Sequence, residues 1–209
     1  QKSSLKCGSM FQKMYYVVGV PQNHPNRQNV GLVYTIADAL EMSIPELLAK
    51  LARIASRNRA QLKFTQLYSI AAESSTIVEE IESMSLDLDW NQIIKELVFL
   101  FMDINIFTLE DPGDSSLYMV AHSQTVERMF PTGYRTLVVI HNTKQETYYP
   151  IYELVSETYF KSGYVDTRLF PGNHTCIKKF SDIITQRYIT MNKSSSINGK
   201  VVKTRSEEH

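Results

Sequence analysis

Apolar residues in the first half of the chain recur mainly at the spacing of an α-helix. The spacing predicts a buried helix over residues 30–40 and a second helix that starts at Ser43–Glu46. In that start signal a Ser is followed three residues later by Glu, so that each side chain can bond the backbone of the other. Asp89 stands ahead of a third apolar helix, where its carboxylate can accept from free backbone N–H groups. Weaker helical patterns lie in between, over residues 62–72 and 76–84.

Strand patterns dominate the second half. Continuous β-branched and aromatic residues are typical of buried strands. A polar loop over residues 142–146 makes the last two strands antiparallel neighbours, and Pro150 predicts an edge position because proline cannot donate to a ladder. An amphipathic helix over Cys176–Ile189 follows them. The predicted strands are Met14–Val20, Ile104–Leu109, Leu117–Val120, Thr136–His141 and Thr147–Leu154.

Helices in front of a mostly antiparallel sheet predict an α+β, or mixed α/β, fold. The 209 residues are enough for one domain with a substantial core. We expect this domain to span residues 14–191. Residues 1–13 are expected to be an N-terminal linker, and the Ser-, Lys- and Gly-rich residues 192–209 a flexible tail.

The charge balance bears on the class of partner. The chain carries 22 basic and 22 acidic side chains, whereas proteins that grip phosphate backbones usually show a basic excess. We therefore expect nucleic-acid binding to be weak. The longest apolar stretch, Leu97–Ile104, is interrupted by Asp103 and is too short to span a bilayer, so no membrane partner is expected.

Candidate chemistry is sparse along the chain. The five histidines form no metal-ligand spacing except His174-Thr-Cys176, which cannot close a zinc site without distant partners. With only 8 glycines the chain offers no phosphate-binding loop, and we expect neither a metal nor a cofactor. The two cysteines, Cys7 and Cys176, are expected to be unpaired thiols. The cluster Glu79, Glu80 and Glu82 is typical of a solvated helix face.

Aromatic residues are plentiful late in the chain. Interleaved with Lys161 and Arg168, they could form a stacking surface for single-stranded nucleic acid. Aromatic enrichment in strands favours the other interpretation, in which they fill a core. These aromatic residues are Tyr148, Tyr149, Tyr152, Tyr159, Phe160 and Tyr164.

The order of elements and three short sequences resemble the ovarian-tumour (OTU) family of papain-like cysteine proteases. There a catalytic cysteine begins a buried helix in a pattern like Asp-Gly-x-Cys-Leu-Phe-Arg-x-x-Ala, with which Gln28–Ala37 aligns. Trp90 and Asn105-Ile-Phe look similar to a Trp-containing turn and an Ile-x-Ile strand further along. The catalytic histidine of the family precedes Tyr at the start of a late strand, where Thr147-Tyr-Tyr-Pro-Ile-Tyr stands.

The resemblance does not extend to the catalytic residues of the family, because other residues stand at their positions in this chain. Gln28 occupies the position of the leading Asp, Gly31 that of the nucleophile, and Thr147 or Tyr148, depending on register, that of the histidine. A cysteine protease needs a thiolate, an imidazole and an orienting group. The resemblance therefore implies a pseudo-protease, not an enzyme, with Tyr148, Tyr149 and Pro150 as candidate binding residues beside the peptide groove. As strand neighbours, Tyr148 and Tyr149 point to opposite faces, so one of them is expected to be accessible.

Inactive segments with a phrase similar to Tyr-Tyr-x-Pro-Ile-Tyr occur in long proteins of nucleocytoplasmic large DNA viruses, such as early transcription factor large subunits. The resemblance implies a protein-interaction module of a larger viral assembly, located in the host cytoplasm (the viral factory) or the virion. Two alternatives stay open. One is an active cysteine hydrolase or deubiquitinase that uses Cys7 or Cys176 with a distant histidine. The other is a transcription factor domain that contacts nucleic acid through its aromatic and basic surface.

Overall fold

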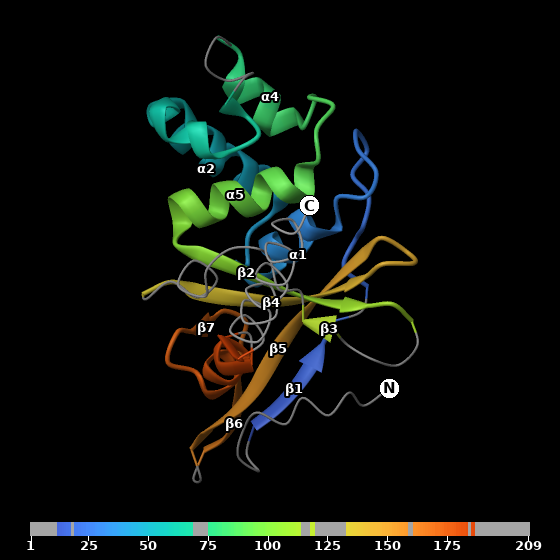
Figure 1. Ribbon diagram of the computed structural model, residues 1–209, viewed down its shortest axis with the longest axis vertical. Coiled ribbons are helices and arrows are strands. Elements are labelled where there is room, and N and C mark those ends of the chain that lie inside the picture. Colours follow the sequence, from blue (N-terminus) through green and yellow to red (C-terminus); the bar gives the residue numbers. More distant parts are fainter. Residues whose placement is uncertain are drawn as a thin grey trace, which may run out of the picture.

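A single mixed sheet divides the molecule, with a thick helical layer on one face and a shorter helix on the other (Figure 1). The computed structural model describes residues 12–17, 19–68, 75–113, 118–119, 133–158, 161–183 and 185–186. The thick layer consists of α1 (Gly31–Ala39), α2 (Ile44–Arg57), the 3-10 helix η1 (Arg59–Phe64), α4 (Ile77–Ser83) and α5 (Trp90–Met102). The opposite face is covered by a helix over residues 175–183.

The sheet has seven strands, in the order β1-β5-β4-β2-β3, with β6 also paired to β5 and β7 to β4. Five of its six pairings are antiparallel, and β2 and β4 form the one parallel pair. The strands are β1 (Gln12–Tyr16), β2 (Ile104–Asp111), β3 (Tyr118–Met119), β4 (Arg135–Asn142), β5 (Thr147–Thr158), β6 (Lys161–Thr167) and β7 (Phe170–Pro171). The fold class is α+β, as predicted from the sequence.

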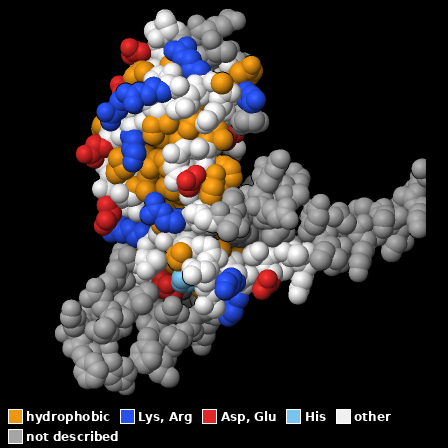
Figure 2. Space-filling view, turned by 90° about the vertical axis from the view of Figure 1, so that its left-hand side faces the viewer, with side chains coloured by type: hydrophobic (Ala, Val, Ile, Leu, Met, Phe, Trp, Pro, Cys, Tyr) orange, Lys and Arg blue, Asp and Glu red, His pale blue; other side chains and the backbone are white. Residues whose placement is uncertain are grey.

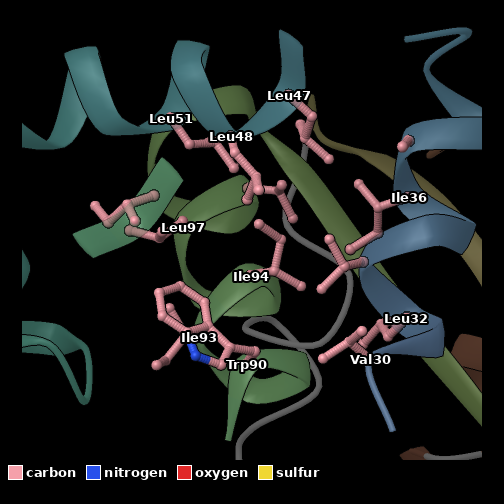
Figure 3. Close-up of a cluster of buried hydrophobic side chains, with 14 of the residues drawn as sticks. Val30, Leu32, Ile36, Leu47, Leu48, Leu51, Trp90, Ile93, Ile94 and Leu97 are labelled. Atoms are coloured by element: carbon pink, nitrogen blue, oxygen red, sulfur yellow. The ribbon is translucent and has the colours of Figure 1, made fainter. Parts of the chain in front are cut away.

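Two hydrophobic clusters hold the layers together, because alternate residues of each strand face opposite sides. On the side of the thick layer, the apolar faces of α2 and α5 meet the largely buried α1 (Figure 3). Leu47, Leu48 and Leu51 of α2 point toward α5 in this cluster (Figure 3). On the other side, Phe107 of β2 stacks on Phe180 with ring centroids 5.1 Å apart. The larger cluster lies against α1, so the position of this helix depends on it.

The predicted helix starts are confirmed in detail. Ser43 accepts a hydrogen bond from the Glu46 backbone N–H, and the Glu46 carboxylate accepts from the Ser43 N–H at 2.8 Å. The Ser43 hydroxyl also donates to the Glu46 carboxylate at 2.7 Å, and this bond, together with the one from the Ser43 N–H, lowers the pKa of Glu46. Asp89 caps α5 by accepting from the Gln92 N–H at 3.2 Å. The three strands expected in one sheet, at 104–109, 136–141 and 147–154, do lie together, with α1 packed against β5 and β4.

Two local predictions are wrong. Pro150 does not mark an edge, because β5 lies between β1 and β4. Proline has no N–H to donate, but Pro150 lies opposite Val17, just beyond the last residue of β1. Its carbonyl still accepts from the Val17 N–H, so only one hydrogen bond, at the end of the β1–β5 ladder, is missing. The helix predicted over 62–72 is interrupted in its described part, where only Leu62–Phe64, in the 3-10 helix, and Tyr68 are helical. The 3-10 turn stops at Thr65, whose hydroxyl donates to the Leu62 carbonyl and accepts from the Leu67 N–H.

Several other elements begin or end a few residues from their predicted boundaries. The first strand covers Gln12–Tyr16 rather than Met14–Val20, because the backbone turns at Gly19, with a φ of 105°, ahead of Pro21. The short strand expected at 117–120 is the pair Tyr118–Met119. The late helix is present over 175–183, and the rest of its predicted span lies mostly outside the described residues. Among the described helices, none is both long and apolar enough to cross a bilayer.

We expect the helical layer to respond to truncation according to burial. Leu97→Ala should lower the free energy of unfolding by about 3 kcal/mol, because the fully buried Leu97 lines the larger cluster and truncation leaves a cavity. Leu100→Ala, on the same helix but half-exposed, is the matched control and should cost less than half as much. Urea unfolding monitored by Trp90 fluorescence measures both. Equal losses would contradict the assigned orientation of α5.

Candidate functional site

The side chain of Gln22 lies against both Gly31 and Tyr148, the positions that the OTU resemblance aligns with that family's nucleophile and histidine. Its Oε1 accepts from the Tyr148 N–H at 2.8 Å, and its Nε2 donates to the Tyr148 carbonyl at 3.0 Å and to the Val20 carbonyl at 2.8 Å. The amide thus pairs with the Tyr148 main chain as a neighbouring strand would. It does so where β5 continues past the end of β1.

Gly31 is required at the start of α1 by this arrangement. A Cβ at position 31 would lie 1.8 Å from Gln22 Oε1, far inside contact distance. The Gln22 amide therefore occupies the space in which any side chain at position 31 would stand. The Gly31 carbonyl accepts from the buried Thr35 hydroxyl at 2.8 Å, so that hydroxyl is already engaged within the helix.

The N-terminus of α1 is capped from another helix. Val30, at its N-cap, offers no side-chain hydrogen bond. Instead Asn91 of α5 accepts from the Leu32 N–H at 3.1 Å and donates to the Asn29 carbonyl at 2.7 Å. The loop before α1 is held by Arg27, which donates to the Met84 and Ser85 carbonyls. Gln28 is exposed on this loop.

Tyr148 lies in a row of polar side chains across the sheet. Its register partner on β4 is His141, whose register partner on β2 is Glu110. The rings of His141 and Tyr148 stack with centroids 4.4 Å apart, and His141 Nε2 lies 3.2 Å from a Glu146 carboxylate oxygen. Burial, reinforced by Asp89, Glu146 and Glu110, raises the pKa of Tyr148 to about 12. Its phenol is therefore neutral at physiological pH and is a poor nucleophile.

The other candidate residues on β5 differ in exposure. Tyr148 and Tyr149 are both half-exposed, on opposite faces of the strand, and Tyr148 also packs against the larger hydrophobic cluster. Pro150 is buried. The Thr147 hydroxyl is buried and has no hydrogen-bond partner. These positions lie in one strand, as predicted, but only Tyr148 contacts the Gln22 amide that lies over Gly31.

The structure describes only part of the aromatic surface that the sequence suggested. Tyr152 is fully buried under α1, so it belongs to the core, and its hydroxyl donates to Asp38. Arg168 lies over the Tyr152 ring, 5.1 Å from its centroid, and 3.7 Å from the Asp38 carboxylate. Tyr159 and Phe160, and the side chains of Lys161 and Tyr164, lie outside the described part of the structure.

A cavity of about 390 Å³ lies beside the other half of α1. Val17, Val20, Tyr34 and Ala37 supply apolar walls, and Asp38 brings one carboxylate to it. That carboxylate already accepts from Tyr152 and lies close to the Arg168 guanidinium, so its charge is largely compensated. This cavity was not predicted from the sequence, because its walls come from three separate segments.

Cys176, the described member of the two alternative nucleophiles, is fully buried next to His174. His174 Nδ1 accepts from the Cys176 backbone N–H at 3.1 Å, and Nε2 lies 2.6 Å from the buried Glu153 carboxylate. Both ring nitrogens are therefore engaged: Nδ1 accepts from the first turn of the late helix, and Nε2 donates to the Glu153 carboxylate. This geometry leaves the His174 ring no free nitrogen to activate the thiol. Cys7 lies outside the described residues.

Metal binding finds no support in the described part of the chain, where no three His, Cys, Asp or Glu side chains gather in a way that could hold an ion.

The comparisons add no relative: no protein-family model matches the chain, and a search of the curated proteins found no match. The functional argument therefore depends on the residues alone.

Sequence reasoning did not identify Gln22, Asn91 or His141 as site residues. Nothing in the polar run around Gln22 marks it as lying beside a helix.

We expect Gly31 and Gln22 to be energetically coupled. Gly31→Ala should cost about 1–3 kcal/mol, because its Cβ displaces the Gln22 amide and leaves the Tyr148 peptide group unpaired. In a Gln22→Ala background the same substitution should be nearly neutral, since the obstructing amide is gone. Urea unfolding of the two single variants and the double variant forms the cycle. An equal cost of Gly31→Ala in both backgrounds would show that the two residues do not meet.

The hydrogen bond between His174 and the buried Glu153 carboxylate gives another prediction. His174→Ala should destabilise by about 3–5 kcal/mol, because it leaves the buried Glu153 carboxylate without its partner. Replacing both residues by Leu should recover most of this loss, because no buried charge remains. Lys178→Ala, exposed on the same helix, is the control and should change little. A double variant as unstable as His174→Ala would contradict the argument.

Proposed function

We propose that this domain is a non-catalytic, OTU-like interaction module of a larger viral protein, with a transcription-related role. One observation carries the proposal. At the position that resembles the OTU nucleophile stands Gly31, and the space beside it is filled by the amide of Gln22. An amide cannot act as the thiolate that the chemistry of this family requires. A pseudo-protease can still use its folded surface to hold a partner.

The polar groups around Gly31 support a binding role rather than a reactive one. The Gln22 amide, the Asn91 amide and the Tyr148 peptide group are paired with one another or with the α1 backbone. Burial raises the pKa of Tyr148 to about 12, so its phenol is protonated at neutral pH, as that of an ordinary Tyr also is. Groups that are fully hydrogen-bonded give a rigid surface, which lowers the ordering cost when a partner binds.

The contact with a protein partner is proposed at the start of β5. A segment that added main-chain hydrogen bonds here would replace the Gln22 amide on Tyr148, in the manner of β-strand addition. Tyr149, half-exposed on the other face, is the candidate anchor. The viral setting, and location in the viral factory or virion, rest on the resemblance of the Tyr148–Tyr152 sequence.

The proposal is tested by reactivity and by capture. We expect no labelling by ubiquitin-based thiol probes and no cleavage of ubiquitin chains. In pull-downs from infected-cell lysate, Tyr149→Ala should weaken capture of the wild-type partners by about 2 kcal/mol or more, since a lost aromatic anchor typically costs that much. The thermal midpoint should hardly change, and Tyr149→Phe, which keeps the ring, should bind nearly normally.

Two outcomes would contradict the proposal. A covalent probe adduct at Cys7 or Cys176 that disappears on mutation to Ser would favour the hydrolase alternative. Identical capture by wild-type and Tyr149→Ala protein would remove Tyr149 as the anchor.

A further inference from the structure

The outward face of α2 carries a row of basic side chains. Lys50, Arg53 and Arg57 are exposed and lie three and four residues apart, so they share one stripe of the helix. The opposite face carries the buried leucines of the core. Arg59 and Lys63 of η1 are exposed beyond the end of this stripe. From Leu47 to Ala72 the sequence contains no Asp or Glu, although the whole chain is neutral.

The row makes no close ion pair within the described fold, and the one carboxylate of α2, Glu46, lies a turn before Lys50 at the start of the stripe. No carboxylate of the described residues lies within ion-pair distance of Lys50, Arg53 or Arg57. The one recorded side-chain bond, from Arg53 Nε to the Ala49 carbonyl, stays within the helix. Like charges three or four residues apart on a helix repel one another. An external anionic group near this row would relieve that repulsion.

Apolar side chains gather on the same side of the molecule. Figure 2 shows hydrophobic atoms between Lys and Arg side chains on this face of the helical layer, with isolated acidic side chains around them. Ile54 is half-exposed and lies one turn from both Lys50 and Arg57. Leu100 and Phe101, in the last turn of α5, are also half-exposed, and α5 packs against α2. Apolar surface of this kind, rimmed by polar groups, is typical of protein–protein contacts.

We propose that the outward face of α2, together with the last turn of α5, binds an acidic amphipathic segment of a partner protein. The partner's carboxylates would pair with Lys50, Arg53 and Arg57, and its apolar side chains would cover Ile54 and the end of α5. The inference rests on the proposed role as an interaction module. It locates the contact on a surface separate from Tyr149.

Two observations favour an acidic protein segment over nucleic acid. Contacts to phosphates need cations but no apolar floor, whereas this face has one. In addition α4, which packs against α2, carries Glu79, Glu80 and Glu82. A long phosphate backbone that followed the basic row would be repelled by such neighbouring charges. A short amphipathic segment can end before it reaches them.

The test uses three labelled probes and fluorescence anisotropy. The first is a synthetic helix-forming peptide with Glu on one face and Leu on the other. The second has every Leu replaced by Ser, and the third is single-stranded oligothymidine. We expect the Glu/Leu peptide to bind in a salt-sensitive way, and the other two probes to bind about tenfold more weakly or worse.

The protein variants isolate the surface. Lys50→Glu, Arg53→Glu and Arg57→Glu together should weaken binding of the Glu/Leu peptide at least about tenfold, because attraction at each position becomes repulsion. The control, Lys178→Glu with Lys179→Glu, changes exposed charges on the opposite side of the sheet and should leave binding unchanged. Circular dichroism melts confirm that both variants fold.

Three results would overturn the inference: no saturable binding of the Glu/Leu peptide, unchanged binding by the triple variant, or tighter binding of oligothymidine. None of these results bears on the thiol-probe or Tyr149 experiments. Failure of the α2 surface is therefore distinguishable from failure of the proposed function.

Discussion

The burial of α1 determines the polar contacts at both of its ends. The helix is packed between the sheet, α2 and α5, and most of its residues are buried, with only Tyr34 and Asp38 half-exposed along one side. A helix terminus in such a place still needs partners for its free backbone groups. Asn91 supplies them at the start, where Val30 cannot. Near the end, Arg168 donates to the Asp38 carbonyl, and Tyr152 donates to the Asp38 carboxylate. Residues distant in sequence thus fix one helix against β5.

The single parallel pairing of the sheet brings the polar row together. Because β2 and β4 run in the same direction, their carboxyl ends meet at one edge, where Glu110 lies beside His141. The tight turn after β4 then returns β5 so that Tyr148 lies beside His141. The start of α1 reaches this edge through Gln22. In this way the topology, rather than any continuous motif, assembles the candidate site.

The sequence predicted those parts of the fold that depend on local chemistry. Helix starts at Ser43 and Asp89 depend on a side chain and a backbone group three residues apart, so a linear pattern reveals them. The position of Pro150 was misjudged because its neighbour across the sheet, β1, comes from the other end of the chain. Gln22 was missed for the same kind of reason, since its partners are Gly31 and, 126 residues away, Tyr148. Patterns within a segment carry no information about such distant contacts.

The two surfaces discussed above differ in how well their polar groups are satisfied. Around Gly31, the Gln22 and Asn91 amides and the Tyr148 peptide group have partners in the fold, which stabilises a defined shape. Along α2, cations are placed close together without described counter-charges, which lowers the stability of the isolated domain slightly. Local choices that work against stability tend to occur where a protein meets a partner. By this reasoning the polar groups around Gly31 stabilise a defined shape, while the basic row on α2 is the surface whose charges an external group could neutralise.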